Sequence, residues 1–158
     1  MNRVALLIGG NQGDRQTLIE EATALIATGI GAVVLASRIY ETEPWGDFGE
    51  EQPLPFLNRA LLVETPLTAH EVLHKALNIE AELGRRRPAI RCHYHSRPMD
   101  IDLIFFNHEV INTPDLQIPH PRMHLRRFVL EPMAEIMPEY IHPTKHLTVQ
   151  QLLDTLAT

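Results

Sequence analysis

The sequence has few features of secreted, membrane-spanning or nucleic-acid-binding proteins. Its only cysteine is Cys92, so the chain cannot form an intramolecular disulfide and gives no sign of an oxidising compartment. Its apolar runs fall far short of the roughly 18 residues that span a membrane, and its first residues lack the pattern of a secretory leader. The net charge is −6, which disfavours nonspecific binding to nucleic acid. We therefore expect a cytoplasmic protein that binds neither membranes nor nucleic acid.

The composition is that of an ordinary globular domain. Hydrophobic residues make up 44% and charged residues 22% of the 158 residues, which argues against disorder. A chain of this length buries roughly 70% of its unfolded surface and can form a substantial core. We expect residues 1–158 to form a single domain that acts as a monomer.

Hydrophobic spacing and turn residues divide the chain into strands and helices. One helical pattern follows Asp14 and ends at Gly29, and a second follows a Thr-x-x-Glu capping box at Thr68 and ends at Gly84. A long loop rich in proline and acidic residues, 42–55, separates the two halves. Apolar runs predict strands at residues 3–8, 32–40, 56–65 and 99–106, and two short helices are expected near 125–136 and 148–156.

The order of these elements is β-α-β, followed by a second β-α-β. This order is typical of the ferredoxin-like βαββαβ pattern, an α+β fold in which helices cover one face of an antiparallel sheet. The sequence contains no internal repeat and no linker that would divide it.

Two aspartates at the start of the last predicted strand, Asp100 and Asp102, are the most informative residues. Residues i and i+2 of a strand point to the same face, so the two carboxylates should project side by side, while Ile101, Leu103 and Phe105 face the opposite way. Adjacent carboxylates repel each other, and a divalent cation relieves that repulsion. Magnesium is usually held by one or two carboxylates together with waters and substrate phosphates. The alternative is a strand whose exposed face carries two acids by chance.

Arginines gather in two short segments that contain no acid. Five lie within residues 85–97, and three more lie within residues 120–127. A local positive site on an acidic protein favours a small anionic ligand, and phosphoryl-type transfer requires arginines of this kind. Two solvated loops are the alternative. The sequence contains no P-loop motif, and we interpret the glycine-rich segment 9–13 as a tight turn at the edge of the site.

Taken together, these segments resemble the 6-hydroxymethyl-7,8-dihydropterin pyrophosphokinase family of folate synthesis. The main carrier of the resemblance is residues 93–104, which read HYHSRPMDIDLI. Supporting matches are residues 8–11 (IGGN), 40–44 (YETEP), 56–58 (FLN), 118–123 (IPHPRM) and 126–132 (RRFVLEP). The order is kept along nearly the whole chain. Tyr94 and His95 depart from the usual family pattern.

The resemblance implies a ferredoxin-like fold, ATP as cosubstrate with two magnesium ions, and a pterin alcohol as the acceptor of the pyrophosphoryl group. It also implies roles for individual residues. Asp100 and Asp102 would hold the magnesium ions, and Glu80 would lie near them. Asn58 would hydrogen-bond the pterin between the rings of Phe56 and Phe128. Contacts with the ATP phosphates would come from Arg85, Arg97, His120 and Arg126, with catalytic Arg85 and Arg97 on a loop that closes during turnover.

Other interpretations of these residues stay open. Phe56 and Phe128 could be ordinary core aromatics, and Asn58 could cap a turn. A different metal enzyme that acts on a nucleotide, such as a nucleotidyltransferase, would also use paired aspartates. A noncatalytic ferredoxin-like module is the third possibility, and it is disfavoured because such a module has no need of paired metal carboxylates.

Overall fold

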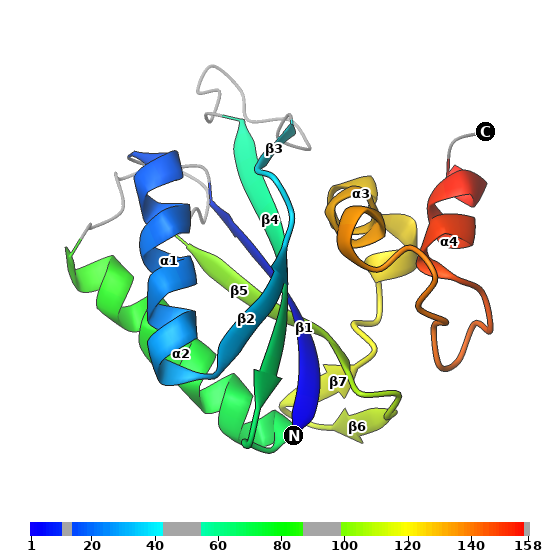
Figure 1. Ribbon diagram of the computed structural model, residues 1–158, viewed down its shortest axis with the longest axis horizontal. Helices are drawn as coiled ribbons and strands as arrows, with labels where there is room; N and C mark the ends of the chain where they lie inside the picture. The colour runs from blue at the N-terminus through cyan, green and yellow to red at the C-terminus, as the bar shows by residue number, and fades with distance from the viewer. Residues whose placement is uncertain (11–13, 43–54, 87–98, 157–158) are drawn as a thin grey trace.

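The computed structural model describes residues 1–10, 14–42, 55–86 and 99–156. Within them the chain forms strands and helices in an order close to the predicted one (Figure 1). The elements are β1 (Asn2–Gly10), α1 (Arg15–Gly29), β2 (Ala32–Ala36), β3 (Tyr40–Thr42), β4 (Phe56–Thr65), α2 (Ala69–Arg86), β5 (Asp100–Phe106), β6 (Ile111–Thr113), β7 (Leu116–Ile118), the 3₁₀ turn η1 (Met123–Leu125), α3 (Arg127–Ile136) and α4 (Val149–Leu156).

The main sheet is antiparallel throughout, with the strand order β2-β4-β1-β5. Strand β3 pairs with the first residues of β4, beyond the end of β2. This order and the two crossover helices agree with the α+β fold of βαββαβ type expected from the sequence. The short hairpin β6–β7 forms a separate two-stranded sheet.

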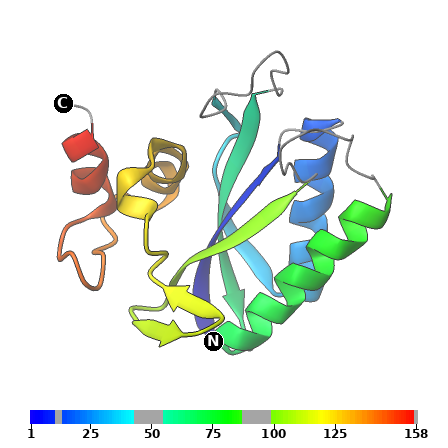
Figure 2. The same ribbon diagram turned by 180° about the vertical axis from the view of Figure 1, so that it is seen from behind.

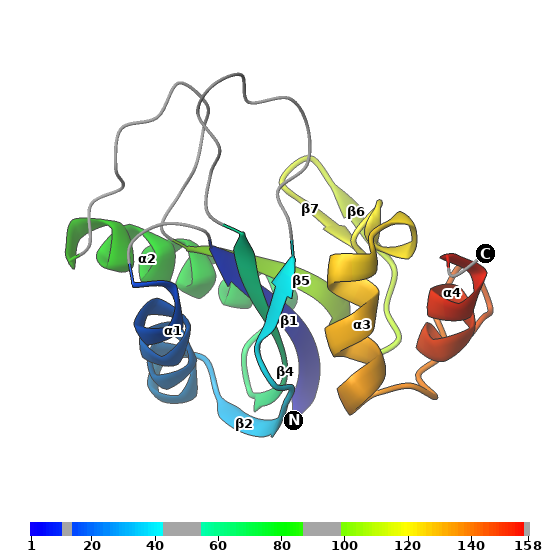
Figure 3. The ribbon, with the colours of Figure 1, turned by 90° about the horizontal axis from the view of Figure 1, so that it is seen from above.

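Helices cover both faces of the sheet (Figures 2 and 3). On one face, α1 and α2 pack on β1, β4 and β5 around a core that includes Leu6, Ile8 and Leu61. On the other face, α3 and α4 pack around a second core that includes Leu7 and Phe105. The prediction of helices on one face was therefore correct for α1 and α2 but incomplete, because α3 covers part of the opposite face. Within the described part of the chain, helices leave the rest of that face uncovered, and a pocket lies there.

Local sequence explains how the two long helices begin. The Asp14 side chain accepts from the Thr17 backbone N–H at 3.3 Å and so caps α1. The predicted capping box before α2 is confirmed: the Thr68 N–H donates to Glu71 at 2.9 Å, and the Glu71 N–H donates to the Thr68 hydroxyl at 3.2 Å. The predicted end of α2 at Gly84 was wrong, since the helix continues to Arg86.

The predicted strand 32–40 is broken in two by Ser37. The Ser37 side chain is buried, and its hydroxyl accepts from the Ala60 N–H at 2.9 Å, while the Ser37 N–H donates to the Ala60 carbonyl at 2.9 Å. A side-chain oxygen thus replaces a strand carbonyl, and the chain bends there between β2 and β3. The bend brings β3 alongside the start of β4.

Strand β5 carries an irregularity that changes the direction of one predicted side chain. Ala5 pairs with Phe105, but the next residue, Leu6, pairs with Leu103, so Ile104 is an extra residue in β5. As a result Phe105 lies in the same core as Ile104, on the face opposite to Ile101 and Leu103. The expectation that Phe105 shares a face with Ile101 and Leu103 was wrong, because strict alternation fails at a bulge.

Candidate active site

A pocket of about 610 Å³ opens on the sheet face that α1 and α2 leave uncovered. Its floor is made by the ends of β1, β4 and β5, and its far wall is made by η1 and the first turn of α3. The volume is suited to a small-molecule ligand. The lining residues are Leu7, Gly9, Thr42, Phe56, Asn58, Asp100, Asp102, Arg122, Leu125, Arg126 and Phe128. Six of the nine residues expected at the site therefore surround one pocket.

Asp100 and Asp102 project from β5 into this pocket, as the alternation of the strand predicts. Both are half-buried, and they pair across β1 with Gly9 and Leu7. The interior side of the strand is fixed by Ile101, which is buried in the core under α2. This burial holds the two carboxylates in place on the pocket side.

Glu80 contacts β5 from α2, on the face of the sheet opposite to the pocket. It projects from α2, and its carboxylate accepts a hydrogen bond of 2.6 Å from the Ile101 backbone N–H. Ile101 lies between the two aspartates, so Glu80 fixes the backbone from which both carboxylates project. The acid lies near the strand expected to bind metal, as the resemblance implies, and its hydrogen bond is to the main chain of β5.

Asn58 lies in β4, on the other side of β1 from the two aspartates, and it is buried, with only 4% exposed. Its amide nitrogen donates to the Thr42 hydroxyl at 3.3 Å, which orients the side chain from β3. Phe56 and Asn58 both face the pocket because they are two residues apart in β4. The edge of a polar amide is thus presented beside an aromatic ring.

Gly9 separates Asn58 from the aspartates and is a residue whose role the sequence interpretation missed. It lies within β1, not in a turn, and pairs with Asn58 on one side and Asp100 on the other. A Cβ built on Gly9 would lie 2.3 Å from the Asn58 side-chain oxygen. Glycine is therefore required for Asn58 to occupy its position, and it leaves the pocket floor flat between the two groups.

The far wall combines an aromatic ring with basic side chains. Phe128 lies in the first turn of α3, and the Arg126 guanidinium lies 5.6 Å from the centre of its ring. Arg122 and Leu125 complete this wall. Only Arg126 and Phe128 were assigned to the site from the sequence. Arg122 belongs to the arginine cluster at residues 120–127, and that cluster was the signal that could have indicated it.

His120 lies beside this wall without lining the pocket. Its N–H donates to the Ile104 carbonyl at 3.1 Å, which attaches the segment to β5, and its Nδ1 accepts from the Arg122 N–H at 3.3 Å. Burial lowers the pKa of His120, and the nearby guanidinium groups of Arg126 and Arg122 lower it further. The imidazole is thus held neutral at pH 7 with Nε2 as its donor, an arrangement suited to an anionic neighbour.

Besides His120, one more described residue expected at the site, Arg85, does not line the pocket. Arg85 is exposed in the last turn of α2, so it does not begin a loop as the sequence interpretation held. Arg97 and most of the arginine-rich segment, residues 87–98, lie outside the described part of the chain, as do residues 43–54 and the turn residues 11–13. Their roles stay predictions.

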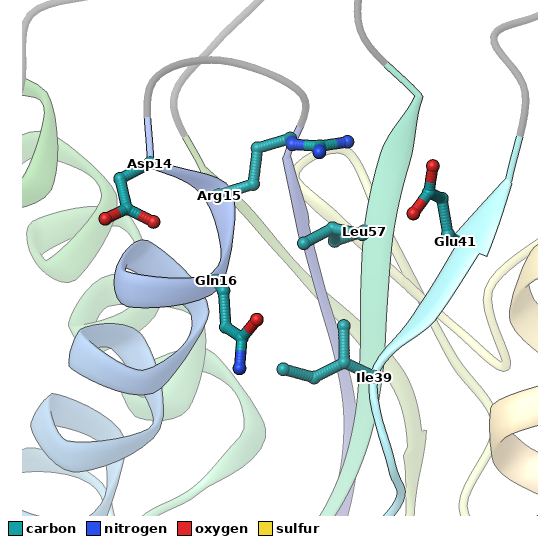
Figure 4. Close-up of a pocket in the computed structure, with 6 residues that line it drawn as sticks. All are labelled: Asp14, Arg15, Gln16, Ile39, Glu41 and Leu57. Carbon is teal, nitrogen blue, oxygen red and sulfur yellow. The ribbon is translucent and has the colours of Figure 1, made fainter.

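A second pocket, of about 540 Å³, lies on the other side of β4 near the start of α1 (Figure 4). Arg15 reaches from α1 above Leu57 and donates to the Pro55 carbonyl at 2.7 Å. Of the described residues expected to bind metal, ATP or pterin, none lines this pocket. The pocket that holds the two aspartates is therefore the candidate active site.

The donors in the candidate site fit magnesium. Within the described ranges, no group of three or more histidine, cysteine, aspartate or glutamate side chains is arranged to hold a metal ion. Two neighbouring carboxylates, Asp100 and Asp102, are the usual protein contribution to a magnesium site, whose other ligands are waters and substrate phosphates. A zinc site of the closed structural kind would require four protein ligands.

None of the helices in the described residues has the length and apolar character needed to cross a membrane.

Comparison with solved structures supports the fold. Two crystal structures of Plasmodium falciparum HPPK-DHPS, the wild type with pterin and p-hydroxybenzoate and the wild type with SDX-DHP, superpose with TM-scores of 0.74 and 0.76. They are 17% and 16% identical to this chain, and the match covers 98% of it but 43% of each of theirs. This chain thus corresponds to less than half of those chains, and the likeness establishes the fold alone.

Comparison with sequences establishes the family. A curated relative from Porphyromonas gingivalis, named 2-amino-4-hydroxy-6-hydroxymethyldihydropteridine pyrophosphokinase, is 39% identical over 141 residues, covering 89% of this chain and 93% of the relative. A relative of the same name from Bacillus subtilis is 42% identical over 138 residues, covering 86% and 79%. The model of one family matches residues 5–138, and the chain belongs to that family, the 7,8-dihydro-6-hydroxymethylpterin-pyrophosphokinases (HPPK).

Proposed function

We propose that the pocket above β1, β4 and β5 is where this pyrophosphokinase transfers the pyrophosphoryl group of ATP to the hydroxymethyl group of 6-hydroxymethyl-7,8-dihydropterin, in the synthesis of folate. The observation that carries the proposal is the shared pocket. Two carboxylates suited to magnesium, an amide, two aromatic rings and two arginines line the same cavity. Each of these groups has a counterpart in the reactants.

The pterin end is formed by Asn58, Phe56 and Phe128. A flat heteroaromatic ring packs well against aromatic faces, and a buried amide recognises the donors and acceptors along its edge. Thr42 orients the Asn58 amide, and Gly9 leaves the room that the amide requires. Asn58 thus hydrogen-bonds to the edge of the pterin, while the two phenylalanines pack against its flat faces.

The ATP end is formed by basic side chains. Arg126 contacts the phosphates from the far wall, where Arg122 adds positive charge. His120, beside that wall, donates from its neutral imidazole to a phosphate oxygen. Arg85 and Arg97 bind the phosphates from the other side and take part in catalysis when their segment approaches the site. The planar fork of arginine donates two parallel hydrogen bonds to a phosphate, which fixes the orientation of the chain.

Asp100 and Asp102 hold magnesium, two ions in the full complex. Bound magnesium supplies neutralisation of the charge that develops on the phosphate oxygens. The two carboxylates position the phosphates next to the pterin, and Glu80 keeps β5 in register by holding the Ile101 N–H. The enzyme contributes alignment and electrostatics in place of covalent chemistry.

In the reaction, the pterin hydroxymethyl oxygen forms a bond to the β-phosphorus of ATP. The bond between that phosphorus and the oxygen bridging to the α-phosphate breaks, and AMP leaves with the electron pair. The hydroxyl proton passes to solvent or to a phosphate oxygen, and we assign no protein base to it.

The test is direct incubation with ATP, magnesium and the pterin alcohol, followed by separation of the nucleotides. We expect AMP in equal amount to a diphosphorylated pterin. ADP would indicate an ordinary kinase, and pyrophosphate would indicate a nucleotidyltransferase, so either product would overturn the proposal. We further propose that the protein works as a cytoplasmic monomer, which sedimentation and fractionation of cells would check.

A further inference from the structure

Glu135 links helix α3 to the neighbouring strand β3 and the residue before it by hydrogen bonds. It lies near the end of α3, and its carboxylate accepts from the Tyr40 hydroxyl at 2.7 Å. The same carboxylate accepts from the Arg38 backbone N–H at 3.1 Å and lies 3.8 Å from the Arg38 side chain. The Arg38 guanidinium in turn lies 4.5 Å from the centre of the Tyr40 ring. We call Tyr40, Arg38 and Glu135 the α3 clamp.

The strand side of the clamp is rigid. Arg38 follows Ser37, whose main chain and side chain are both hydrogen-bonded to Ala60 of β4. The Ser37 carbonyl also accepts from the Arg59 side chain at 2.9 Å. The bend between β2 and β3 is thus fixed to β4, so Glu135 attaches α3 to a defined point of the sheet.

The clamp is next to the proposed pterin site. Tyr40 pairs directly with Asn58 across β3 and β4, so the two side chains lie on the same face about 5 Å apart at their Cβ atoms. Two residues further along β3, Thr42 carries the hydroxyl that orients the Asn58 amide. The strand that recognises the pterin edge and the strand held by the clamp are therefore immediate neighbours.

On the helix side of the clamp, α3 also carries Phe128, the second aromatic residue of the proposed pterin site. Glu135 and Phe128 are seven residues apart in α3, which is two turns, so they share one side of the helix at a separation of about 10 Å. Pro132 lies between them and has no N–H, so the Phe128 carbonyl lacks its helical donor. The first turn of α3 is thus weakened at Phe128, and its place depends on how the rest of the helix is held.

We propose that Tyr40 and Glu135 are positioning residues for the pterin, because their hydrogen bond fixes α3 at the distance from β4 that lets Phe128 pack on the ring held by Asn58. This inference rests on the proposed function of the pocket. The apolar contacts of α3 are non-directional, whereas the hydrogen bond between Tyr40 and Glu135 has a preferred geometry. A gap of about 0.5–1 Å already forfeits a quarter to a half of a van der Waals contact.

The test is Tyr40→Phe, which removes one hydroxyl and keeps the ring. We expect the dissociation constant for the pterin, measured by calorimetry with a nonhydrolysable ATP analogue and magnesium present, to rise about fivefold to tenfold. The affinity for the ATP analogue alone should stay unchanged. The Michaelis constant for the pterin should rise more than the turnover number falls.

Three further variants separate positioning from a general loss of stability. Glu135→Gln keeps an oxygen that accepts from Tyr40 and should bind pterin nearly as well as the wild type. Glu135→Ala should lose at least as much affinity as Tyr40→Phe, because it also removes the acceptor of the Arg38 N–H. The double variant Tyr40→Phe with Glu135→Ala should be no worse than Glu135→Ala alone. Glu131→Gln is the matched control, since it breaks an ion pair with Arg127 within the same helix and leaves the hydrogen bond between Tyr40 and Glu135 in place, and its pterin affinity should be normal.

Each outcome decides the matter. If Tyr40→Phe lowers the urea midpoint but binds pterin as the wild type does, the residues are structural only and the inference is wrong. Equal losses for pterin and the ATP analogue would also contradict it. Failure of the wild type to bind the pterin would overturn the proposed function itself, a result that the wild-type titration reports separately.

Discussion

Replacing Gly9 with alanine tests the geometry of the pocket floor with one carbon atom. The added Cβ would lie 2.3 Å from the Asn58 side-chain oxygen, 3.3 Å from its Cγ, and 3.1 Å from the Leu57 carbonyl. The carbonyl belongs to the paired main chain of β4 and cannot move freely. The Asn58 side chain must therefore rotate away.

The cost of this rotation can be worked out from the contacts of Asn58. Leaving its rotamer costs about 0.5–1.5 kcal/mol. Losing the hydrogen bond to Thr42 costs about 0.5–1.5 kcal/mol more. We therefore expect Gly9→Ala to lower the free energy of unfolding by about 1–3 kcal/mol. Because the displaced amide is the proposed reader of the pterin, pterin affinity should fall by at least about tenfold, while affinity for the ATP analogue should change little.

Two other glycines provide controls for the assay, which combines urea unfolding with calorimetric titration of each ligand. Gly84 lies in α2, and a Cβ added there would have no neighbouring atom within 4 Å, so Gly84→Ala should raise stability by about 0.5–1 kcal/mol and leave both affinities unchanged. At Gly31 a Cβ would lie 2.1 Å from the Glu64 carbonyl, so Gly31→Ala should destabilise the protein without selecting between ligands. Normal pterin affinity in Gly9→Ala would refute the reasoning.

Further expected outcomes concern the metal, the pterin, the arginine segment and pH. Asp100→Ala and Asp102→Ala should each lower turnover by on the order of 10²-fold or more with an unchanged circular dichroism spectrum; near-normal turnover in either would remove it from the site. Asn58→Ala should weaken pterin binding by about 1–3 kcal/mol in calorimetry and leave ATP binding unchanged; equal losses would indicate a folding defect. Arg85→Ala should slow the chemical step in single-turnover kinetics more than it weakens ATP binding, and the reverse order would contradict its catalytic role. Burial lowers the pKa of His142 from its ordinary 6.5 to about 4, so the unfolded chain binds this proton first as the pH falls. Protonation of His142 should therefore lower the free energy of unfolding by up to about 3 kcal/mol between pH 6.5 and 4. This share of the drop should be lost in His142→Gln and retained in the surface control His74→Gln.

The sequence correctly predicted the directions of side chains where the local strand pattern alone determines them. Asp100 and Asp102 share a face because alternation is a property of the extended backbone, and nothing between them disturbs it. Phe105 was misplaced because the bulge at Ile104 arises from pairing with β1, more than 90 residues away in the chain. Alternation within β5 contains no information about that pairing.

The opposite wall could not be predicted from local pattern. Phe128 and Arg126 reach the pocket because α3 packs on the sheet face that α1 and α2 leave open. Helical spacing indicates that α3 has an apolar side but not which face of the sheet receives it. Only the family resemblance predicted that Phe128 and Arg126 lie in the same site as Asn58. The packing of α3 on the sheet explains why these residues line one pocket.

Gly9 illustrates why glycine in a strand is hard to interpret from sequence alone. The run of glycines at 9–13 is typical of a turn, but Gly9 and Gly10 are strand residues. The need for glycine comes from Asn58 on β4, a neighbour that is remote in the chain. A glycine at the end of an apolar run can mark a close approach from the next strand as readily as a turn.

The strand register also sets the spacing between the two ends of the proposed site. Asn58, Gly9 and Asp100 are direct cross-strand neighbours, so they form one row across β4, β1 and β5. Adjacent strands lie about 4.8 Å apart, which places the backbones of Asn58 and Asp100 about 10 Å from each other. A pterin whose edge contacts Asn58 would extend along this row, with its hydroxymethyl group toward the carboxylates. Because the row is held by main-chain hydrogen bonds, the sheet fixes the distance between Asn58, which we propose binds the pterin, and the proposed metal ligands, and Gly9 keeps the space between them open.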